Sequence, residues 1–487
     1  MTPLLQLDEV HVVSDLHLGG ADGFQIFGAG AELARFVDHL AGQPAGRRVA
    51  LVINGDFVDF LAEAPSAYFD PAGATAKLDR VVGDPAFAPV FAALQRFTAA
   101  ADRILVVNLG NHDLELALPW VREHLLDILC GGSEAARGRI RIVMDGAGFL
   151  CRVGEAKVLC LHGNEVDPWN VADYERLRRI GRDLSHGRPV EPWIPNAGTQ
   201  LVIDIMNGIK RDFPFVDLLK PEAEGVVPTL LALDPGVWDR IHRIGSSLRR
   251  VGRDRVRMAA GFLAGEEPAS EQGAAAAPQL PPAWGETAMT SNYAHALLDR
   301  AEQRFRGSEE PLALIDCDEQ GEYLGLVGAA WKLVRGRPTH EVLAEALEQL
   351  DKDRSFDFRA EDDTYAELDR WVGGEIDFIV AGHTHLERAL RRRSANGWYF
   401  NSGTWARLIK LEADVRGHPE KFKAVFDAFK GGTMAALDAH PGLVLKRPTV
   451  VALWAEGNAV HGELRRVNPL PDPLVTTAVK GSRFTRD

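Results

Sequence analysis

Five short apolar segments of the sequence each end in a cluster of polar side chains that could hold a metal ion. The segments are rich in β-branched residues and about five residues long, which favours buried strands. The clusters carry carboxylate, imidazole and amide groups, whereas a simple turn needs little more than glycine and asparagine. Along the chain, the clusters supply Asp15 and His17, then Asp56, then Asn111, then His162, and finally His383 and His385.

Imidazole nitrogens together with carboxylate and amide oxygens form a mixed set of donors. Such a set suits first-row divalent metals, with manganese first among them and iron, zinc, cobalt or nickel as alternatives. Seven donors are too many for one tetrahedral ion but suit two ions that share a bridging carboxylate. Two ions about 3.5–4 Å apart can stabilise both the attacking and the leaving oxygen of a phosphoryl displacement. The donor set therefore predicts phosphoester chemistry at a dinuclear centre.

Helical patterns separate the first of these segments, which predicts how the clusters are positioned. They cover residues 31–40, 88–101 and 116–128. Alternating strands and helices indicate an α/β protein with layered packing. In such sheets, ligands bind where loops emerge from the ends of the strands. We therefore expect the five polar clusters to meet at one edge.

The sequence motifs DLH, GDFVD, GNHD, HG and GHTH occur in this order. In that order they resemble the calcineurin-like metallophosphoesterase superfamily, over roughly residues 1–170 and 375–465. The resemblance implies an αββα sandwich, two divalent metal ions and a hydroxide between them as the nucleophile. The stretches SDLHLGG and GDFVDF are also similar to the UDP-2,3-diacylglucosamine hydrolase branch, although that family is much shorter than this chain.

The same resemblance assigns a role to each donor. It places Asp15, His17 and His385 on the first metal, Asn111, His162 and His383 on the second, and Asp56 as the bridge between them.

The GNHD motif also implies two residues that act on the substrate side. By the resemblance, His112 does not bind metal but stabilises the phosphoryl oxygens and protonates the leaving group as general acid. Asp113 would orient His112. For Asp59 two interpretations stay open: it either supports Asp56 from behind or caps the following helix.

Residues 171–374 interrupt the alternation of strands and helices. Most of this stretch is helical in pattern, and a segment near 265–286 is rich in Pro, Ala and Glu, as flexible linkers are. We predict one α/β domain formed by residues 1–170 and 375–487, with 171–374 inserted as a mainly helical cap. Candidate substrate contacts follow the HG motif, since a fork of guanidinium groups suits phosphate, although a solvated helix face explains the same pattern. These candidates are Asn164, Arg176, Arg179 and His186.

Composition limits the other classes of function. The 487 residues carry a net charge of −14, which argues against general nucleic-acid binding. The start of the sequence lacks a basic region, no apolar run approaches the length of a membrane span, and the four cysteines show no CxxC spacing, so we expect a cytoplasmic protein. Arg391, Arg392 and Arg393 precede a predicted hairpin turn and are expected to be solvated.

The predicted function is a metal-dependent phosphatase or phosphodiesterase acting on a small or lipid-linked phosphoester. Two alternatives remain. A nuclease of the same superfamily would need a basic groove, which the acidic balance of the chain does not favour. A non-catalytic scaffold for protein binding would keep the fold but not the complete set of ligands that this sequence retains.

Overall fold

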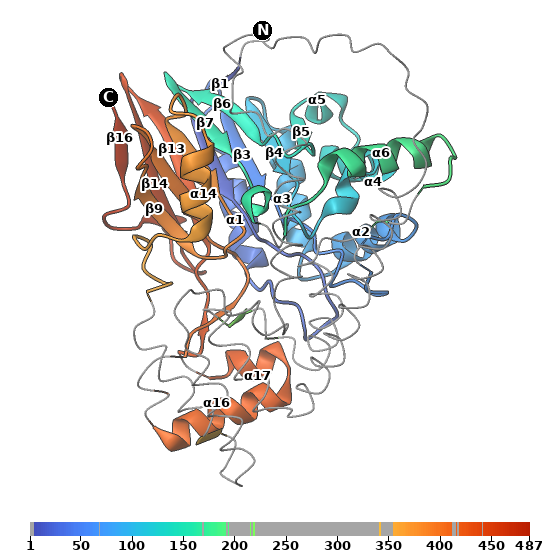
Figure 1. The fold of residues 1–487 in the computed structure, drawn as a ribbon, viewed down its shortest axis with the longest axis vertical. Helices are drawn as coiled ribbons and strands as arrows, with labels where there is room; N and C mark the ends of the chain where they lie inside the picture. Colours follow the sequence, from blue (N-terminus) through green and yellow to red (C-terminus); the bar gives the residue numbers. More distant parts are fainter. Residues whose placement is uncertain are drawn as a thin grey trace, which may run out of the picture.

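The protein has an α/β fold in which two β-sheets pack face to face and helices cover their outer faces (Figure 1). This confirms the predicted fold class. The segment near 265–286 and most of the predicted cap lie outside the residues that the structure describes. The computed structural model describes residues 4–67, 69–167, 170–190, 193, 215, 218–219, 340–341, 354–411, 415, 418–440 and 442–487.

The larger sheet contains the first three predicted strands side by side. β2, β3, β4 and β5 are parallel, and β13 joins β2 in the antiparallel direction. β3 and β4 are buried at every position, as continuous apolar runs of parallel strands require. The order across this sheet is β15 (Thr476–Ala478), β14 (Ala459–Val467), β13 (Thr449–Glu456), β2 (Glu9–Val13), β3 (Val49–Asn54), β4 (Arg103–Asn108) and β5 (Ile140–Val143), with β16 (Phe484–Arg486) paired to β14.

The other two predicted strands lie in a second sheet. β7 and β8 are parallel neighbours although more than 200 residues of chain separate them. β6 and β7 form the hairpin around the turn at Gly154. The order across the sheet is β1 (Leu5–Leu7), β6 (Phe149–Val153), β7 (Ala156–Cys160), β8 (Phe378–Ala381), β10 (Trp398–Ser402) and β9 (Glu387–Arg391).

An apolar core fills the space between the two sheets. Val12 and Val106 of the larger sheet belong to the same buried cluster as Val158 and Phe378 of the smaller one. Alternate residues of each strand point to opposite faces of its sheet, so the same strands also bury residues against the helices outside. Burial of apolar side chains on both faces therefore fixes the two sheets against each other and holds the ends of their strands in place.

Helices of the first half of the chain cover the outer face of the larger sheet. α1 places Leu33, Phe36, Val37 and Leu40 on one buried stripe, which is the spacing of an amphipathic helix. The covering helices are α1 (Gly30–Ala41), α2 (Ala74–Gly83), α3 (Ala88–Ala99), α4 (Pro119–Cys130) and α5 (Glu134–Arg137), with a short 3₁₀ turn, η1 (Leu114–Ala117), before α4.

One helix of the predicted cap instead covers the smaller sheet. α14 (Asp363–Trp371) packs Tyr365 and Leu368 against Ile379 and Tyr399. This helix therefore completes the second outer layer of the sandwich, although it precedes the predicted boundary at residue 375. The domain boundaries as a whole remain a prediction, because most of the cap is outside the described residues.

Arg392 departs from the prediction that the three arginines before the hairpin turn are solvated. Arg391 and Arg393 are exposed, but Arg392 is buried and its Nε lies 3.0 Å from Oδ1 of Asp369. Its guanidinium also donates to the backbone carbonyls of Asp369 and Val372 at the end of α14, and to those of Gly373 and Ile376 just beyond it. The unsatisfied carbonyls of a helix C-terminus favour a cation, which explains its burial.

Two helices near the end of the chain lie away from the sheets. α16 (Pro419–Gly431) and α17 (Met434–Asp438) are at the bottom of Figure 1, beyond the edge where the metal-binding candidates lie. The Phe429 ring of α16 stacks on Phe215 of the predicted cap, with 4.5 Å between the ring centroids. A helix that lies within the second α/β segment, before β13, therefore contacts the predicted cap.

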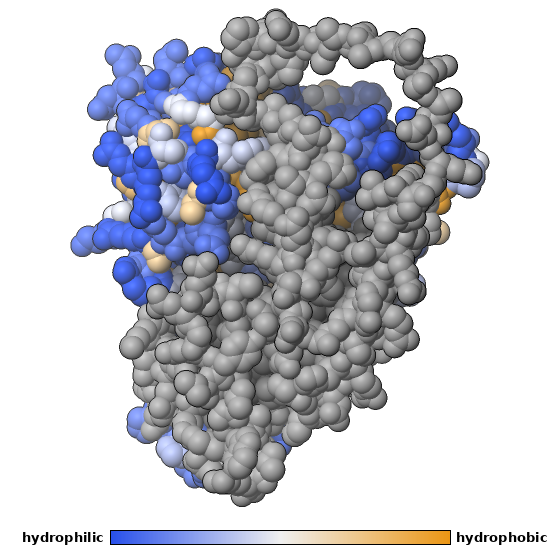
Figure 2. All heavy atoms as spheres, in the orientation of Figure 1, coloured by the Kyte–Doolittle hydropathy of each residue, from blue (hydrophilic) through white to orange (hydrophobic). Residues whose placement is uncertain are grey.

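The described surface is mostly polar on the side where β9 and β14 lie (Figure 2). None of the helices in the described ranges combines the length and the apolarity needed to traverse a bilayer.

Candidate metal centre

The five polar clusters lie at the carboxyl ends of strands from both sheets. β2, β3 and β4 lead into the first three clusters, and β7 and β8 of the second sheet lead into the others. The face-to-face packing of the sheets brings these strand ends together, as the sequence predicts. The side chains concerned are Asp15, His17, Asp56, Asn111, His162, His383 and His385.

Five of these residues share an uncommon backbone conformation. Asp15, His17, Asp56, His383 and His385 have φ angles of 53°, 48°, 51°, 71° and 62°. Residues other than glycine rarely adopt positive φ, and such strain is concentrated at functional sites. Among the described residues, the only further non-glycine residue with positive φ is Asp102, far from this edge at the start of β4. The strand ends are therefore bent sharply at the residues that carry the donors.

Two glycines allow the loops to approach each other closely. A Cβ atom on Gly110 would lie 2.2 Å from Oδ1 of Asp56, and one on Gly55 would lie 2.3 Å from Nδ1 of His162. Both distances are far below van der Waals contact. The glycines of the GD and GNH motifs are therefore required for the donors to converge.

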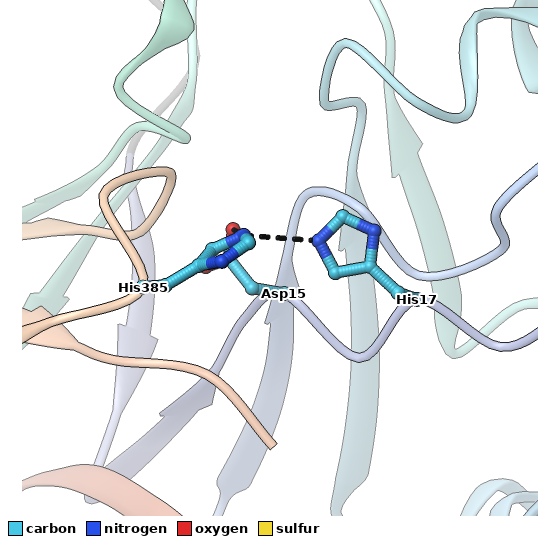
Figure 3. A group of neighbouring side chains, drawn as sticks. All are labelled: Asp15, His17 and His385. Carbon is cyan, nitrogen blue, oxygen red and sulfur yellow. Dashed lines mark hydrogen bonds and ion pairs between the residues drawn. The ribbon is translucent and has the colours of Figure 1, made fainter. Parts of the chain in front are cut away.

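The first group of donors is tightly assembled (Figure 3). Nε2 of His17 lies 3.1 Å from Nε2 of His385, which lies 3.4 Å from Oδ1 of Asp15. One donor atom from each of the three residues falls within 4.8 Å of the others. Burial would raise the pKa of Asp15, but His385 and His162 outweigh it and lower that pKa to about 2. The hydroxyl of Ser14 donates to Oδ2 of Asp15 and lies 2.6 Å from the hydroxyl of Ser402.

The second group of donors is centred on Asp56. Oδ2 of Asp56 lies 3.2 Å from Nε2 of His162, whose Nδ1 lies 2.8 Å from the carbonyl oxygen of Asn54. His383 is held differently, because its Nε2 lies 2.8 Å from Oδ2 of Asp167. That contact leaves Nδ1 of His383 as the nitrogen for a metal ion, whereas His162 presents Nε2.

Asp56 also connects the two groups. The same oxygen that faces His162 lies 3.8 Å from Nε2 of His17, which belongs to the first group. The other oxygen accepts a hydrogen bond from the backbone N–H of His112. Burial would raise the pKa of Asp56, but the charges of His162 and His112 lower it well below its usual value. The carboxylate is therefore held ionised, with one oxygen directed at both groups.

The donor atoms fit a cation. Oδ1 of Asn111 is buried and has no hydrogen-bond partner. Buried polar atoms normally find a partner, so an atom without one indicates a missing ligand. Imidazole nitrogen, amide oxygen and carboxylate oxygen are donors for first-row divalent metals. The arrangement therefore suits the predicted metal ions.

The structure shows other contacts for Asp113 and His112 than their predicted pairing, which stays a prediction. Both carboxylate oxygens of Asp113 accept from backbone N–H groups, Oδ1 from Gly110 at 2.7 Å and Oδ2 from Phe57 at 2.8 Å. The carboxylate beside Nδ1 of His112 is that of Asp59, with Oδ2 at 3.3 Å. Asp113 therefore stabilises the two loops, and Asp59 is the residue placed to orient His112.

Asp59 contacts the first group as well as His112. Its Oδ2 also lies 3.3 Å from Nδ1 of His17, and its Oδ1 accepts from the N–H groups of Leu61 and Ala62. Burial would raise the pKa of Asp59, but His112 and His17 lower it well below its usual value. Asp59 therefore closes a local turn, not the N-terminus of the following helix, which begins at Ala74, and the side chains that it contacts at the site are those of His17 and His112.

The four candidate substrate contacts remain predictions. Asn164 is buried in a 3₁₀ turn, η2 (Asn164–Val166), and its amide contacts the hydroxyl of Tyr174. The other three lie on or just after α6 (Tyr174–Ser185), where Arg179 and His186 are exposed. Arg176 places its guanidinium carbon 5.9 Å from the centre of the Trp193 ring.

Sequence reasoning did not show that two residues hold donors in place. Ser14 hydrogen-bonds Asp15, and Asp167 holds His383. A signal for Ser14 was present, because a hydroxyl immediately precedes the first ligand in the SDLH motif. The pairing of Asp167 with His383 joins segments that are 216 residues apart, so no local pattern could have shown it.

Comparison with known proteins agrees with the site. Residues 9–216 match the family model of the calcineurin-like phosphoesterases. The matched range contains the first four clusters and ends before His383. No curated protein matches the chain. The match and the clustered Asp and His side chains support a metal-dependent phosphoester hydrolase of this superfamily. The narrower resemblance to the UDP-2,3-diacylglucosamine hydrolase branch stays a prediction.

Proposed function

We propose that this protein is a dinuclear, metal-dependent phosphoester hydrolase. The observation that carries the proposal is the position of Asp56 between the two groups of donors. One of its carboxylate oxygens lies 3.2 Å from His162 and 3.8 Å from His17, which belong to different groups. A single buried carboxylate between two sets of imidazoles is suited to bridge two cations, as a dinuclear centre requires.

In this proposal the donors divide as the superfamily resemblance implies. When bound, the two ions, with manganese proposed first, would supply positive charge to the phosphoryl oxygens and an activated water. The first ion would be held by Asp15, His17 and His385, the second by Asn111, His162 and His383, and both by Asp56.

The proposed proton donor is His112. Its side chain is about one-fifth exposed, whereas the metal donors around it are more deeply buried. The carboxylate of Asp59 at 3.3 Å from Nδ1 would hold a proton at that nitrogen and thereby fix the ring orientation. His112 would then present Nε2 to the leaving group and donate its proton as the ester bond breaks.

We further propose that residues 171–374 select the substrate as a cap. Support comes from the described residues at the ends of this segment. α6 packs against η1, directly after the GNHD motif, and Leu219 forms a parallel bridge with Ile409. A small or lipid-linked phosphoester is the substrate class that we favour.

Hydrolysis of two matched chromogenic substrates tests the proposed function. One is an aryl phosphomonoester and the other a bis-aryl phosphodiester, each assayed after loading the protein with manganese. Asp56→Asn serves as the blank, and Asp102→Asn, which changes the positive-φ aspartate outside the site, serves as the matched control. Turnover of either ester that is lost in Asp56→Asn and kept in Asp102→Asn is the expected result. Absence of turnover with two ions bound would favour the non-catalytic scaffold.

A further inference from the structure

Two buried asparagines, Asn54 and Asn108, lie at the ends of neighbouring strands of the larger sheet. Asn54 is the last residue of β3, Asn108 is the last residue of β4, and the two are partners in the register of these strands. Both side chains are buried, although the cluster that fills the space between the sheets is hydrophobic. Burial of a polar side chain costs free energy unless its hydrogen bonds are restored inside the protein. The hydrogen-bond partners of this amide pair therefore show what the two residues hold.

The amide pair bonds the larger sheet to the smaller one. Nδ2 of Asn108 donates to Oδ1 of Asn54 at 2.7 Å and to the backbone oxygen of Cys160 at 3.0 Å. Nδ2 of Asn54 donates to the backbone oxygen of Leu161 at 2.6 Å. Cys160 ends β7 and Leu161 follows it, so both backbone acceptors belong to the segment that leads into His162. The two sheets are therefore joined by side chains directly before a metal donor.

The orientation of both amides is determined by the atoms around them. Nδ2 of Asn54 also reaches the backbone oxygen of Val380 in β8 at 3.3 Å, so each Nδ2 faces two oxygen acceptors. If either amide were turned over, its own oxygen would face these acceptors, and no hydrogen bond could form between them. The same contacts are not available to an apolar side chain. The arrangement thus depends on an amide at both positions.

Asn54 also contacts the metal donor itself. Its backbone oxygen lies 2.8 Å from Nδ1 of His162, whose Nε2 lies 3.2 Å from Oδ2 of Asp56. Asp56 follows Asn54 by two positions, and Asn111 follows Asn108 by three. The amide pair therefore connects the strand ends that carry three donors of the second group, and it holds both the His162 ring and the segment before it.

We propose that Asn54 and Asn108 are positioning residues that set the affinity of the second metal ion by fixing the segment of His162 against the loop of Asp56. The inference rests on the proposed function, because it concerns one of the two proposed ions. Donors of the second group must keep their spacing for the ion to bind, and residues that orient ligands contribute to metal affinity in this way. His162 belongs to the second group alone, so the second ion should depend on the amide pair more than the first.

Manganese titration of leucine variants tests this inference. Leucine is similar to asparagine in shape but forms no side-chain hydrogen bond. The affinities of both sites are measured by titration calorimetry for the wild type, Asn54→Leu, Asn108→Leu and the double variant, and EPR distinguishes an isolated manganese ion from a coupled pair. Gln95→Leu is the matched control, because Nε2 of Gln95 donates to the backbone oxygen of Ile128 at 2.6 Å between α3 and α4, outside the metal centre.

Urea unfolding of each variant separates positioning from stability. Replacing both partners of a buried hydrogen bond with apolar groups of the same shape can be nearly neutral, so the double variant is expected to fold. Asn108→Ser keeps a hydroxyl that can donate to one of the two acceptors. It supplies the same comparison if a leucine variant does not fold, with a smaller expected effect.

Each leucine substitution should weaken the second ion about tenfold or more, because loss of a partner behind a ligand typically costs about 10- to 100-fold in metal affinity. The first ion should change less than about twofold, and Gln95→Leu should change neither. The double variant should lose no more affinity than the weaker-binding single variant, since residues that act as one unit are not additive.

An unchanged second site, or equal weakening of both sites, would overturn the positioning role. Selective loss of the second ion in a protein that hydrolyses no ester would refute the hydrolase and leave the role of the amide pair standing. A wild type that takes up a single ion would overturn both the dinuclear centre and this inference.

Discussion

The two groups of donors form the two halves of the candidate metal centre, and one histidine in each half, His17 or His383, is held through the opposite ring nitrogen. In the first half, His17 contacts Asp59 through Nδ1 and presents Nε2 to its neighbours. In the second half, His383 contacts Asp167 through Nε2 and has Nδ1 left for a metal. The nitrogen that binds a metal is determined by the partner of the other nitrogen. The halves therefore depend on different supporting carboxylates, although their donors are of the same types.

The carboxylate that belongs to the first half and the carboxylates behind the second half also differ in charge. Asp15 of the first half has its pKa lowered to about 2, because its histidine neighbours outweigh burial. Behind the second half, burial and the charge of Asp56 raise the pKa of Asp113 to about 7, and burial raises that of Glu115 to about 8. Negative charge is thus concentrated where the donors converge and is reduced in the layer behind them.

The largest effect is expected from removing the carboxylate that the halves share. Asp56→Asn should lower the number of bound manganese ions from two to fewer than one, because the amide cannot supply negative charge to both ions. Activity should fall by at least about 100-fold, since even the loss of outer partners costs about 10- to 100-fold. Metal analysis after gel filtration, together with the ester assay, measures both quantities.

Asn111→Ala provides the comparison for Asp56→Asn, because Asn111 belongs to the second half alone. It should leave about one ion bound, by the first half. Two ions bound by Asp56→Asn with unchanged affinity would contradict the bridging role.

His112→Asn should separate chemistry from metal binding. Both ions should stay bound, because the substitution removes no metal ligand. The value of kcat should fall about 10²- to 10⁴-fold, because the substitution removes the general acid. Asp59→Asn should lower kcat less steeply, since it leaves the acid in place but removes its contact at 3.3 Å. Metal content and the pH profile of kcat are measured together. Turnover by His112→Asn equal to that of the wild type would exclude the acid role.

Asp167→Asn should weaken the second half selectively. Loss of the contact at 2.8 Å frees the His383 ring, and losing such a supporting carboxylate typically costs about 10- to 100-fold in metal affinity. Two-site manganese titration should show one weakened site and one unchanged site. Asp79→Asn is a matched control. Oδ1 of Asp79 lies 2.6 Å from Nε2 of His124 in an exposed contact between a carboxylate and a histidine, and this pair is not part of the metal centre. Equal weakening of both sites would show that the halves do not have separate supports.

The sequence predicted the positions of the metal donors better than it predicted the residues that hold these donors in place. Strand ends are readable because apolar runs stop where polar clusters begin, and Asp56 and His162 both follow such runs. The residues that hold the donors in place are determined by contacts between loops that are distant in the sequence. Asp113 is next to His112 in sequence, yet its carboxylate is used by Gly110 and Phe57, and Asp59, which holds the ring, is 53 positions earlier.

The sequence pattern also could not predict which single polar residues are buried. Arg392 lies between two exposed arginines, and only the end of α14 against the hairpin shows why it is inside. The same helix shows why the cap boundary was hard to place. Its amphipathic pattern matches that of the helices predicted for the cap, and only its packing on Ile379 and Tyr399 reveals that it belongs to the sandwich.

The smallest expected effect comes from Glu115, which lies in the layer behind the second half. It changes the free energy of unfolding and not metal binding or activity. Glu115 has a pKa of about 8 in the folded protein against 4.5 for the free group. Between these values the unfolded chain loses a proton that the folded protein keeps, so stability contributed by this group falls as pH rises from 4.5 to 8 and changes little above. At about 1.36 kcal/mol per unit, the penalty at pH 8 is on the order of a few kcal/mol.

Glu115→Gln removes this titration and keeps an oxygen to accept from the N–H of Asp70, which Oε1 now does at 3.0 Å. The variant should match the wild type in urea unfolding at pH 5 and be more stable at pH 8, while the exposed Glu123→Gln should show no such dependence on pH. Metal binding by the first half should be unchanged, because Asp15 and its partners lie on other loops. An equal difference in stability at both pH values would mean that Glu115 does not stay protonated behind the second half, and the contrast in charge between the halves would be lost.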